Sequence, residues 1–233
     1  MSAPAPGGVP VIAIDGPSGS GKGTVCRALA DRLGWHLLDS GALYRLVALA
    51  GARQGVAPDD APGHAAVASA LAVEFGVDEA GDERILLAGD DVTRAIRTER
   101  AGAEASRVAA MPPVRAALLD RQRAFARPPG LVADGRDMGT VVFPAAPLKI
   151  FLTASPEERA QRRHKQLKEK GVTVTIADLS QEIRERDLRD SSRPVAPLRP
   201  ADDAVALDST GLGIEQVVAQ VLELARGRIT AKV

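Results

Sequence analysis

A glycine-rich loop with a single lysine follows an apolar stretch near the start of the chain. The segment VPVIAID, residues 9–15, has the pattern of a buried strand, and GPSGSGKGT, residues 16–24, follows it directly. Glycines let the backbone turn its N–H groups inward at a helix start, where the helix dipole adds positive potential and Lys22 can reach an outer phosphate. The pattern predicts a loop that binds the phosphates of a nucleoside triphosphate, and its predicted ligands are Gly16, Pro17, Ser18, Gly19, Ser20, Gly21, Lys22, Gly23 and Thr24.

The loop departs from the strict phosphate-loop pattern at one position. That pattern places Ser or Thr directly after the lysine, whereas here Gly23 intervenes and the hydroxyl belongs to Thr24. Thr24 is therefore a weaker candidate for direct contact with Mg²⁺. Asp134, at the end of the apolar segment LVAD, is a second metal candidate. Its carboxylate can orient a metal-bound water or accept hydrogen bonds from loop amides, and both interpretations stay open.

Five short apolar segments alternate with helical patterns along the chain. The segments are residues 9–15, 35–39, 130–135, 148–154 and 203–209, and the helical patterns are residues 22–33, 43–54, 113–127, 156–170, 179–189 and 214–226. Buried strands joined by crossover helices predict a parallel sheet with helices on both faces, a three-layer α/β/α fold with five central strands.

Two stretches interrupt this alternation. Residues 58–98 are loop-rich and then contain LAVEF and RILLAG around DEAGDE, which indicates a small antiparallel insert. Residues 156–193 form a basic helical pair interrupted by KGVTVTIAD. Residues 1–9 have the composition of a mobile tail.

Charge and composition exclude several classes of protein. Thirty basic and thirty acidic side chains cancel, and only 3% of the chain is aromatic, so neither nucleic acid nor an anionic membrane is an expected partner. One cysteine and three separated histidines predict neither an internal disulfide nor a zinc site. With no signal peptide and no apolar run of about 20 residues, we expect a cytoplasmic protein.

Two other classes of nucleotide-binding protein are excluded because the chain lacks features that they require. The chain contains no asparagine, so it lacks the Asn-Lys-x-Asp segment with which a guanine-nucleotide switch reads its base. A mechanical ATPase would need a longer chain with a second acidic strand end. Kinases of small molecules remain.

Four further segments, taken with the loop, carry a resemblance to a known family. The segments LLDSGALYR (37–45), ADGRDMGTVVFP (133–144), EERAQRR (157–163) and RERDLRDSSR (184–193) strongly resemble bacterial cytidylate kinases, in order and over nearly the whole chain. The resemblance implies a P-loop kinase fold, ATP as phosphoryl donor, Mg²⁺, and CMP or dCMP as acceptor with UMP weaker. It also implies a monomer built from a core (10–60, 105–155 and 195–233), a monophosphate-binding insert (61–104) and a helical lid (156–194).

The resemblance assigns phosphate-binding roles to particular arginines. Arg45, Arg136 and Arg186 match the residues that hold the acceptor phosphate and the phosphoryl group in transit, for which guanidinium forks are suited. Arg162 matches the arginine near the donor phosphates. Lys22, Arg136, Arg162 and Arg186 are thus the predicted catalytic groups. No general base is required, because the acceptor is already an ionised phosphate.

Charge runs are usually solvated helix faces, and some arginines fit that description. We expect Arg159, Arg163 and Arg184 to be of this kind. Arg186, Arg189 and Arg193 have spacings that place them on one helix face if the helix continues through the serines at 191 and 192. Such a stripe of positive charge favours an anion as its partner.

By the same resemblance, a further set of residues recognises the base and sugar, namely Ser40, Ser106, Arg115, Asp137, Asp190 and Arg193. A carboxylate such as Asp137 can accept from the exocyclic amine of cytosine. The open alternatives are that Asp137 orients Arg136 or caps a helix, and that Ser40 and Ser106 are helix caps. Trp35, Tyr44 and Cys26 are expected to be packing residues.

Two other functions stay open. One is phosphorylation of another small acceptor on the same scaffold. The other is a non-catalytic module that senses nucleotides or binds RNA.

Overall fold

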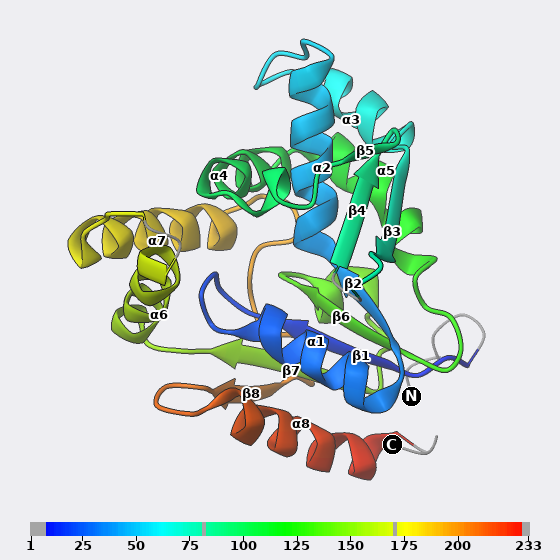
Figure 1. The fold of residues 1–233 in the computed structure, drawn as a ribbon. Coiled ribbons are helices and arrows are strands. Elements are labelled where there is room, and N and C mark those ends of the chain that lie inside the picture. The colour runs from blue at the N-terminus through cyan, green and yellow to red at the C-terminus, as the bar shows by residue number, and fades with distance from the viewer. Residues whose placement is uncertain (1–7, 81–82, 170–171, 230–233) are drawn as a thin grey trace. The chain divides into compact units, whose positions relative to one another are not determined.

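The predicted sheet forms with all five strands. A computed structural model describes residues 8–80, 83–169 and 172–229. The strands are β1 Val11–Asp15, β2 His36–Asp39, β6 Leu131–Gly135, β7 Leu148–Thr153 and β8 Val205–Asp208. They lie in the order β2-β6-β1-β7-β8, every neighbouring pair is parallel, and β1 occupies the centre (Figure 1).

The helices include the six expected from the sequence and two that were not expected. Their bounds are α1 Lys22–Leu33, α2 Ser40–Arg53, α3 Ala61–Ser69, α4 Glu99–Val108, α5 Pro112–Arg123, α6 Pro156–Glu169, α7 Ile176–Ser191 and α8 Ile214–Arg228. A 3-10 turn η1 spans Ala95–Arg97 and a π-helical turn η2 spans Met138–Val142. None of the helices in the described ranges is both long enough and apolar enough to cross a bilayer.

Side-chain alternation along β1 assigns its two faces. Ile12 and Ile14 point into the core that α1 and α8 cover. Asp15 therefore points to the opposite face, where its carboxylate meets the backbone of η2. Helical segments thus cover both faces of the sheet, which confirms the predicted fold class.

Helix α3 corrects the expectation of a loop-rich stretch after residue 58. Asp60 caps the helix by accepting a hydrogen bond from the Gly63 N–H at 2.9 Å, and a proline occupies its first turn. The sequence pattern suggested loop because Asp and Pro, which favour turns, also favour a helix start. The antiparallel insert is confirmed, with β3 Val73–Val77, β4 Glu83–Leu87 and β5 Asp90–Asp91 in one small sheet.

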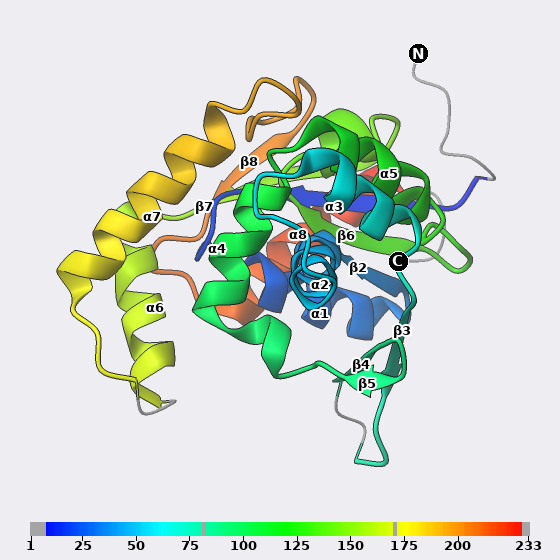
Figure 2. The same ribbon diagram turned by 90° about the horizontal axis from the view of Figure 1, so that it is seen from above.

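Contacts divide the chain into two compact units. We call Met1–Asp39 with Arg123–Val233 the sheet unit, and Ser40–Gln122 the insert unit. Residues 40–60 and 105–122, expected in the core, group with the insert because α2 packs on α3 and α4. Helices α6 and α7 pack on each other within the sheet unit, side by side in Figures 1 and 2. The functional division into core, insert and lid stays a prediction, and residues 1–7 of the expected tail lie outside the described ranges.

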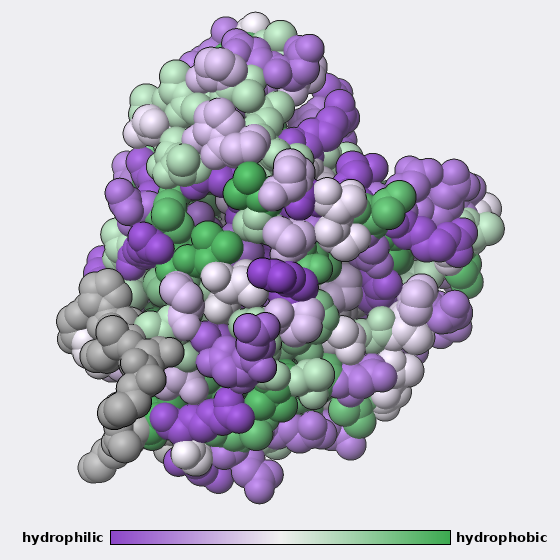
Figure 3. Space-filling model, turned by 180° about the vertical axis from the view of Figure 1, so that it is seen from behind, coloured by the Kyte–Doolittle hydropathy of each residue, from purple (hydrophilic) through white to green (hydrophobic). Residues whose placement is uncertain are grey.

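Exposed apolar side chains are scattered over the surface. Large ones occur on several elements, namely Phe75, Val77, Val172, Ile176, Leu188 and Val195. On the face seen in Figure 3, hydrophilic and hydrophobic residues are intermixed. The surface visible there shows no single large apolar patch.

Candidate active site

The carboxyl ends of the parallel strands bring acidic residues to one edge of the sheet. Asp39 at the end of β2 is in register with Asp134 on β6, and Asp15 at the end of β1 is in register with Gly135. The glycine-rich loop leaves from this edge and enters α1 at Lys22. Ligands of open parallel sheets bind at this edge.

Two glycines in the loop are required by its geometry. Gly21, the N-cap of α1, has φ 88°, which side chains rarely tolerate. A Cβ atom on Gly16 would overlap the carbonyl oxygen of Leu152 in β7. The loop therefore lies closer to the neighbouring strand than any other residue type would permit.

Three cationic side chains hold carbonyl oxygens of the loop. The donors and acceptors are Lys22 Nζ to Pro17 O at 2.9 Å, Arg159 Nη1 to Ser18 O at 3.1 Å and Arg162 Nη1 to Ser20 O at 3.3 Å. A trans peptide points its carbonyl and its N–H in opposite directions. Each of these carbonyls therefore points toward its cation, and the N–H group of the following residue, 18, 19 or 21, points away from that contact and is not turned toward the same donor.

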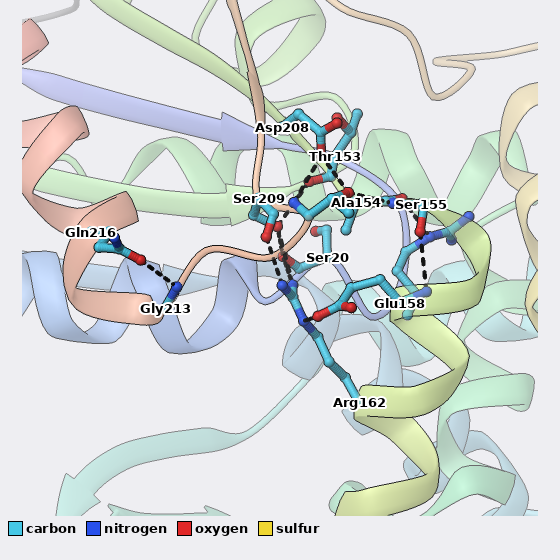
Figure 4. Close-up of polar contacts among 12 residues, drawn as sticks. Ser20, Thr153, Ala154, Ser155, Glu158, Arg162, Asp208, Ser209, Gly213 and Gln216 are labelled. Atoms are coloured by element: carbon cyan, nitrogen blue, oxygen red, sulfur yellow. Dashed lines mark hydrogen bonds and ion pairs between the residues drawn. The ribbon is translucent and has the colours of Figure 1, made fainter.

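Arg162 is anchored to the loop through Ser209, which follows β8 (Figure 4). Its Nη2 donates to Ser209 O at 2.7 Å, its Nη1 to Ser209 Oγ at 3.1 Å, and its Nε to Glu158 Oε1 at 2.9 Å. The Ser209 hydroxyl also lies 3.1 Å from Ser20 O. Arg162 is thus beside the loop, as expected, and Ser209 is a supporting residue that only its position after a strand could have suggested.

A cluster of arginines surrounds the buried Asp190 of α7. Arg136 Nε is 3.0 Å from Asp190 Oδ2, and Arg193 Nε donates to the Asp190 backbone oxygen at 3.2 Å. Burial opposes ionisation of Asp190, but the charges of Arg136, Arg193 and Arg186 outweigh it and hold the pKa of this carboxyl below its usual value. The structure brings together four of the expected phosphate and sugar residues.

The expected arginine stripe on α7 needs correction. The helix ends at Ser191, so Arg193 lies beyond it, while Arg189 is exposed. Serines 191 and 192 turn their hydroxyls back onto carbonyls of the last turn, at 2.8 Å from Asp187 O and 2.6 Å from Leu188 O. The residues that converge are Arg186, Asp190 and Arg193, without Arg189.

Lys22 lies within the electrostatic field of this cluster. Burial, with the positive charges of Arg136 and Arg186, lowers the pKa of Lys22 to about 8, while the negative charge of Asp134 opposes the shift. The cationic form of the lysine is therefore poorly compensated by the protein. An anionic phosphate at this position would restore its stability.

Asp15 is a structural carboxylate that the sequence reasoning did not single out. It is almost fully buried, and it accepts hydrogen bonds from the N–H groups of Met138 and Gly139, each at 2.8 Å. Burial raises the pKa of Asp15 to about 7, partly offset by these two amides. The carboxylate thereby fixes the backbone directly after Arg136 and Asp137.

Asp137 is buried at the start of η2. Its side chain makes no capping hydrogen bond to that turn, so helix capping does not explain it. Its own carbonyl accepts from the Val141 and Val142 N–H groups instead. Base recognition by Asp137 stays a prediction.

The insert unit holds the other expected substrate residues. Arg45 of α2 donates to Ile96 O at 2.7 Å, and Arg115 of α5 is buried over the Tyr44 ring, 5.6 Å from its centroid. Tyr44 therefore supports an arginine as well as packing in the core, whereas Trp35 and Cys26 are core residues.

The two serines expected at the substrate site lie on different helices of the insert unit. Ser106 lies near the C-terminal end of α4, whose N-cap is Thr98, so Ser106 is not the N-cap of that helix. Ser40 is the first residue of α2 and is buried.

Arg159 contradicts the expectation of a solvated helix face. Its side chain is buried and makes contacts with Ser18, Ala154 and Asp187. Arg184 is exposed, and Arg163 is half-buried. A sequence pattern of charge cannot distinguish these three, because only the tertiary fold sets which helix face meets the loop.

The residues at the strand edge fit a hard cation held by water. Asp134 Oδ2 lies 3.3 Å from the position of a Cβ on Gly23, so the glycine leaves room beside this carboxylate, and Thr24 is exposed in the first turn of α1. Among the described residues, no group of three or more His, Cys, Asp or Glu side chains could by itself hold a metal ion. A carboxylate and a hydroxyl suit Mg²⁺, which keeps several waters and takes its other ligands from phosphates.

Comparison with known proteins decides the family. The cytidylate kinase family model matches residues 12–227. This chain belongs to the cytidylate kinase family. A cytidylate kinase of Pseudomonas aeruginosa (strain LESB58) is 62% identical over 217 residues, covering 93% of this chain and 95% of the relative. One of Colwellia psychrerythraea (strain 34H) is 57% identical over 221 residues, covering 95% of this chain and 98% of the relative.

A solved gluconokinase of Sinorhizobium meliloti 1021 is also similar in structure. It has 19% sequence identity and a TM-score of 0.46, covering 97% of this chain and 95% of that one. A score at this level adds nothing to the argument. The family assignment rests on sequence alone.

Proposed function

We propose that this member of the cytidylate kinase family transfers the γ-phosphoryl group of ATP to CMP and dCMP, forming ADP and CDP or dCDP. The observation that supports the proposal most directly is that the positive charges of Arg136 and Arg186 act on Lys22 of the phosphate loop. The chain is also 57–62% identical to cytidylate kinases over nearly its whole length. A phosphate donor and a phosphate acceptor both need positive charge. The sheet unit carries the phosphate loop and the cluster of Arg136, Arg186 and Arg193.

The donor side consists of the loop and its supports. Loop amides and Lys22 bind the β- and γ-phosphates, and Arg162, anchored by Ser209, adds charge beside them. Thr24 and Asp134 would hold Mg²⁺, Asp134 through water. When bound, the ion would supply positive charge to neutralise the phosphates.

The acceptor side consists of the arginines. Arg136 and Arg186 hold the phosphoryl group in transit, and Arg45 holds the phosphate of CMP. A loose transition state spreads charge over three equatorial oxygens, so fixed guanidinium groups stabilise it more than they stabilise the ground state. Asp190 orients Arg136 through their 3.0 Å ion pair. The ionised acceptor phosphate attacks without a general base.

Recognition of cytosine falls to Asp137, with Ser40, Ser106 and Arg115 completing the acceptor site and Asp190 and Arg193 near the sugar. An ionised Asp137 accepts from the exocyclic amine of cytosine and meets a carbonyl oxygen in uracil. UMP is therefore the weaker acceptor.

The test is ADP formation from Mg-ATP with CMP, dCMP, UMP, AMP, GMP, shikimate and gluconate as acceptors. We expect CMP and dCMP to exceed every other acceptor by at least about fivefold in kcat/KM, since one lost base contact costs about 1–3 kcal/mol. Lys22→Met should reduce turnover about 10²- to 10³-fold, as expected for one electrostatic stabiliser.

Lys165→Met, which removes an exposed lysine on α6, is the matched control and should keep wild-type turnover. Turnover of shikimate or gluconate with none of CMP would assign the chain to another acceptor. Binding of ATP without any ADP formation would indicate a non-catalytic module.

A further inference from the structure

Arg159 is a buried arginine whose three guanidinium nitrogens each contact another group of the protein. It lies in the first turn of α6 with its side chain 5% exposed. Its Nε donates to Ala154 O at 3.1 Å, its Nη1 to Ser18 O at 3.1 Å, and its Nη2 lies 2.7 Å from Asp187 Oδ2. A guanidinium with three such partners is held in one orientation, so it acts on its neighbours and not on a phosphate.

One end of this arrangement is the donor loop. Ser18 O accepts from Arg159, and a Cβ on Gly19 would lie only 3.2 Å from the Arg159 Cβ. The loop backbone is therefore packed directly on Arg159. A shift of the loop on phosphate binding would therefore change the position of the Arg159 guanidinium.

The other end is helix α7, which carries acceptor-side residues. Asp187 follows Arg186 in the chain, and Asp190, one turn further on, holds Arg136 at 3.0 Å. Because α6 and α7 also pack on each other, the Arg159–Asp187 pair fixes how α7 presents this face relative to the loop.

The energetics of the pair make it sensitive to loss of one member. Arg159 is buried, and Asp187 is 28% exposed. Removing one partner of such a pair leaves a desolvated charge, whereas replacing both by apolar groups of similar size is often neutral for stability. The coupling role and the stability role of the pair can therefore be separated by choice of variant.

We propose that Arg159 is a positioning residue that couples occupancy of the donor loop to the acceptor-side residues Arg186 and Asp190 of α7. The coupling runs through Ser18 on one side and Asp187 on the other. The proposal rests on the proposed function. It predicts that ATP and CMP bind synergistically, and that the synergy depends on Arg159.

The test measures the dissociation constant of CMP by calorimetry, with and without a non-hydrolysable ATP analogue, and kcat and KM for both substrates. In wild type we expect the analogue to tighten CMP binding at least about fivefold, a typical coupling between sites. In Arg159→Met the ratio should fall to about one, and kcat should fall at least tenfold. CMP binding without the analogue should change less than threefold.

Three further variants separate coupling from folding. Arg159→Lys keeps the charge but cannot span all three partners, so it should restore only part of the coupling. Arg159→Met with Asp187→Leu should recover thermal stability and still lack coupling. Arg184→Met, which removes an exposed arginine from α7, should behave as wild type.

Two results overturn the proposal while leaving the proposed function intact. They are an active wild type without synergy, and an Arg159→Met variant that keeps wild-type synergy and kcat. If wild type neither binds nor phosphorylates CMP, the assay of ADP formation with the different acceptors contradicts the proposed function. The proposal on Arg159 is then contradicted with it.

Discussion

Asp137 is the residue on which the choice of base depends. Asp137→Ala removes the carboxylate that accepts from the cytosine amine, so the ratio of kcat/KM for CMP over UMP should fall about 10- to 100-fold. The measurement is the steady-state rate of ADP formation with each acceptor.

The matched control is Asp208→Asn, at an exposed carboxylate after which β8 ends. It should leave the CMP to UMP ratio unchanged. An Asp137→Ala variant that loses activity equally with CMP and UMP would contradict base recognition and favour a role in orienting Arg136.

Asp15 predicts an unusual dependence of stability on pH. Because the pKa of Asp15 is raised to about 7 in the folded state, chiefly by burial, the folded chain keeps a proton that the unfolded chain loses near pH 4. The free energy of unfolding of wild type should therefore fall relative to Asp15→Asn as the pH rises from about 4 to about 7, by roughly 2–4 kcal/mol. Urea titrations at several pH values measure this difference.

Asp208→Asn provides a control in which the free energy of unfolding should depend on pH in the opposite direction. Hydrogen bonds from the Thr210 side chain and backbone N–H lower the pKa of Asp208, so its contribution to stability is lost as the pH falls. A stability difference between wild type and Asp15→Asn that does not vary between pH 4 and 7 would show that Asp15 is not protonated on folding.

At the level of elements, the junction between β1 and the loop is the most constrained backbone. Gly16→Ala would place a Cβ against the Leu152 carbonyl of β7, so either strand or loop must move. We expect a loss of stability of about 1–3 kcal/mol, as for overpacking, and loss of measurable ATP binding. Urea unfolding and titration with a fluorescent ATP analogue measure the two effects.

Gly227→Ala is the matched substitution in α8, where a Cβ would meet open space. Alanine favours a helix over glycine by up to about 1 kcal/mol, so this variant should be as stable as wild type or more so. ATP binding by Gly16→Ala with wild-type affinity would mean that the loop does not need its close approach to β7.

At the level of the whole molecule, the residues assigned to one CMP come from both units. Arg136 and Arg186 belong to the sheet unit, and Arg45 and Arg115 to the insert unit. If they act on one acceptor, ligands that fill both substrate sites should favour a closed state that excludes water from the phosphates. We expect a bisubstrate analogue to lower the radius of gyration in small-angle scattering, and CMP or ATP alone to lower it less.

Lys22→Met is the control, because weakened phosphate binding should reduce the compaction at equal ligand concentration. An unchanged radius of gyration with the bisubstrate analogue would exclude closure of appreciable amplitude. The forward scattering also gives the mass, which checks the expectation of a monomer.

Local patterns in the sequence were sufficient for much of the fold. Strand and helix periodicities predicted the five-stranded parallel sheet, α1 with its correct bounds, and the antiparallel insert. They missed α3, because its capping Asp and its proline have the composition of a turn. They predicted a helix over residues 179–189, whereas α7 spans Ile176–Ser191 and Arg193 lies beyond it, since serines both end helices and occur within them.

What the sequence by itself determined is the phosphate loop, the parallel sheet behind it and the family, because each depends on residues close together in the chain or on long matched segments. Only the tertiary structure decided that Arg159 is buried on the loop, that Asp15 holds the backbone after Asp137, and that Ser209 anchors Arg162. These contacts join residues more than 40 positions apart. The local pattern around a charged side chain in a helix does not indicate which distant carbonyl or carboxylate folding brings into contact with it.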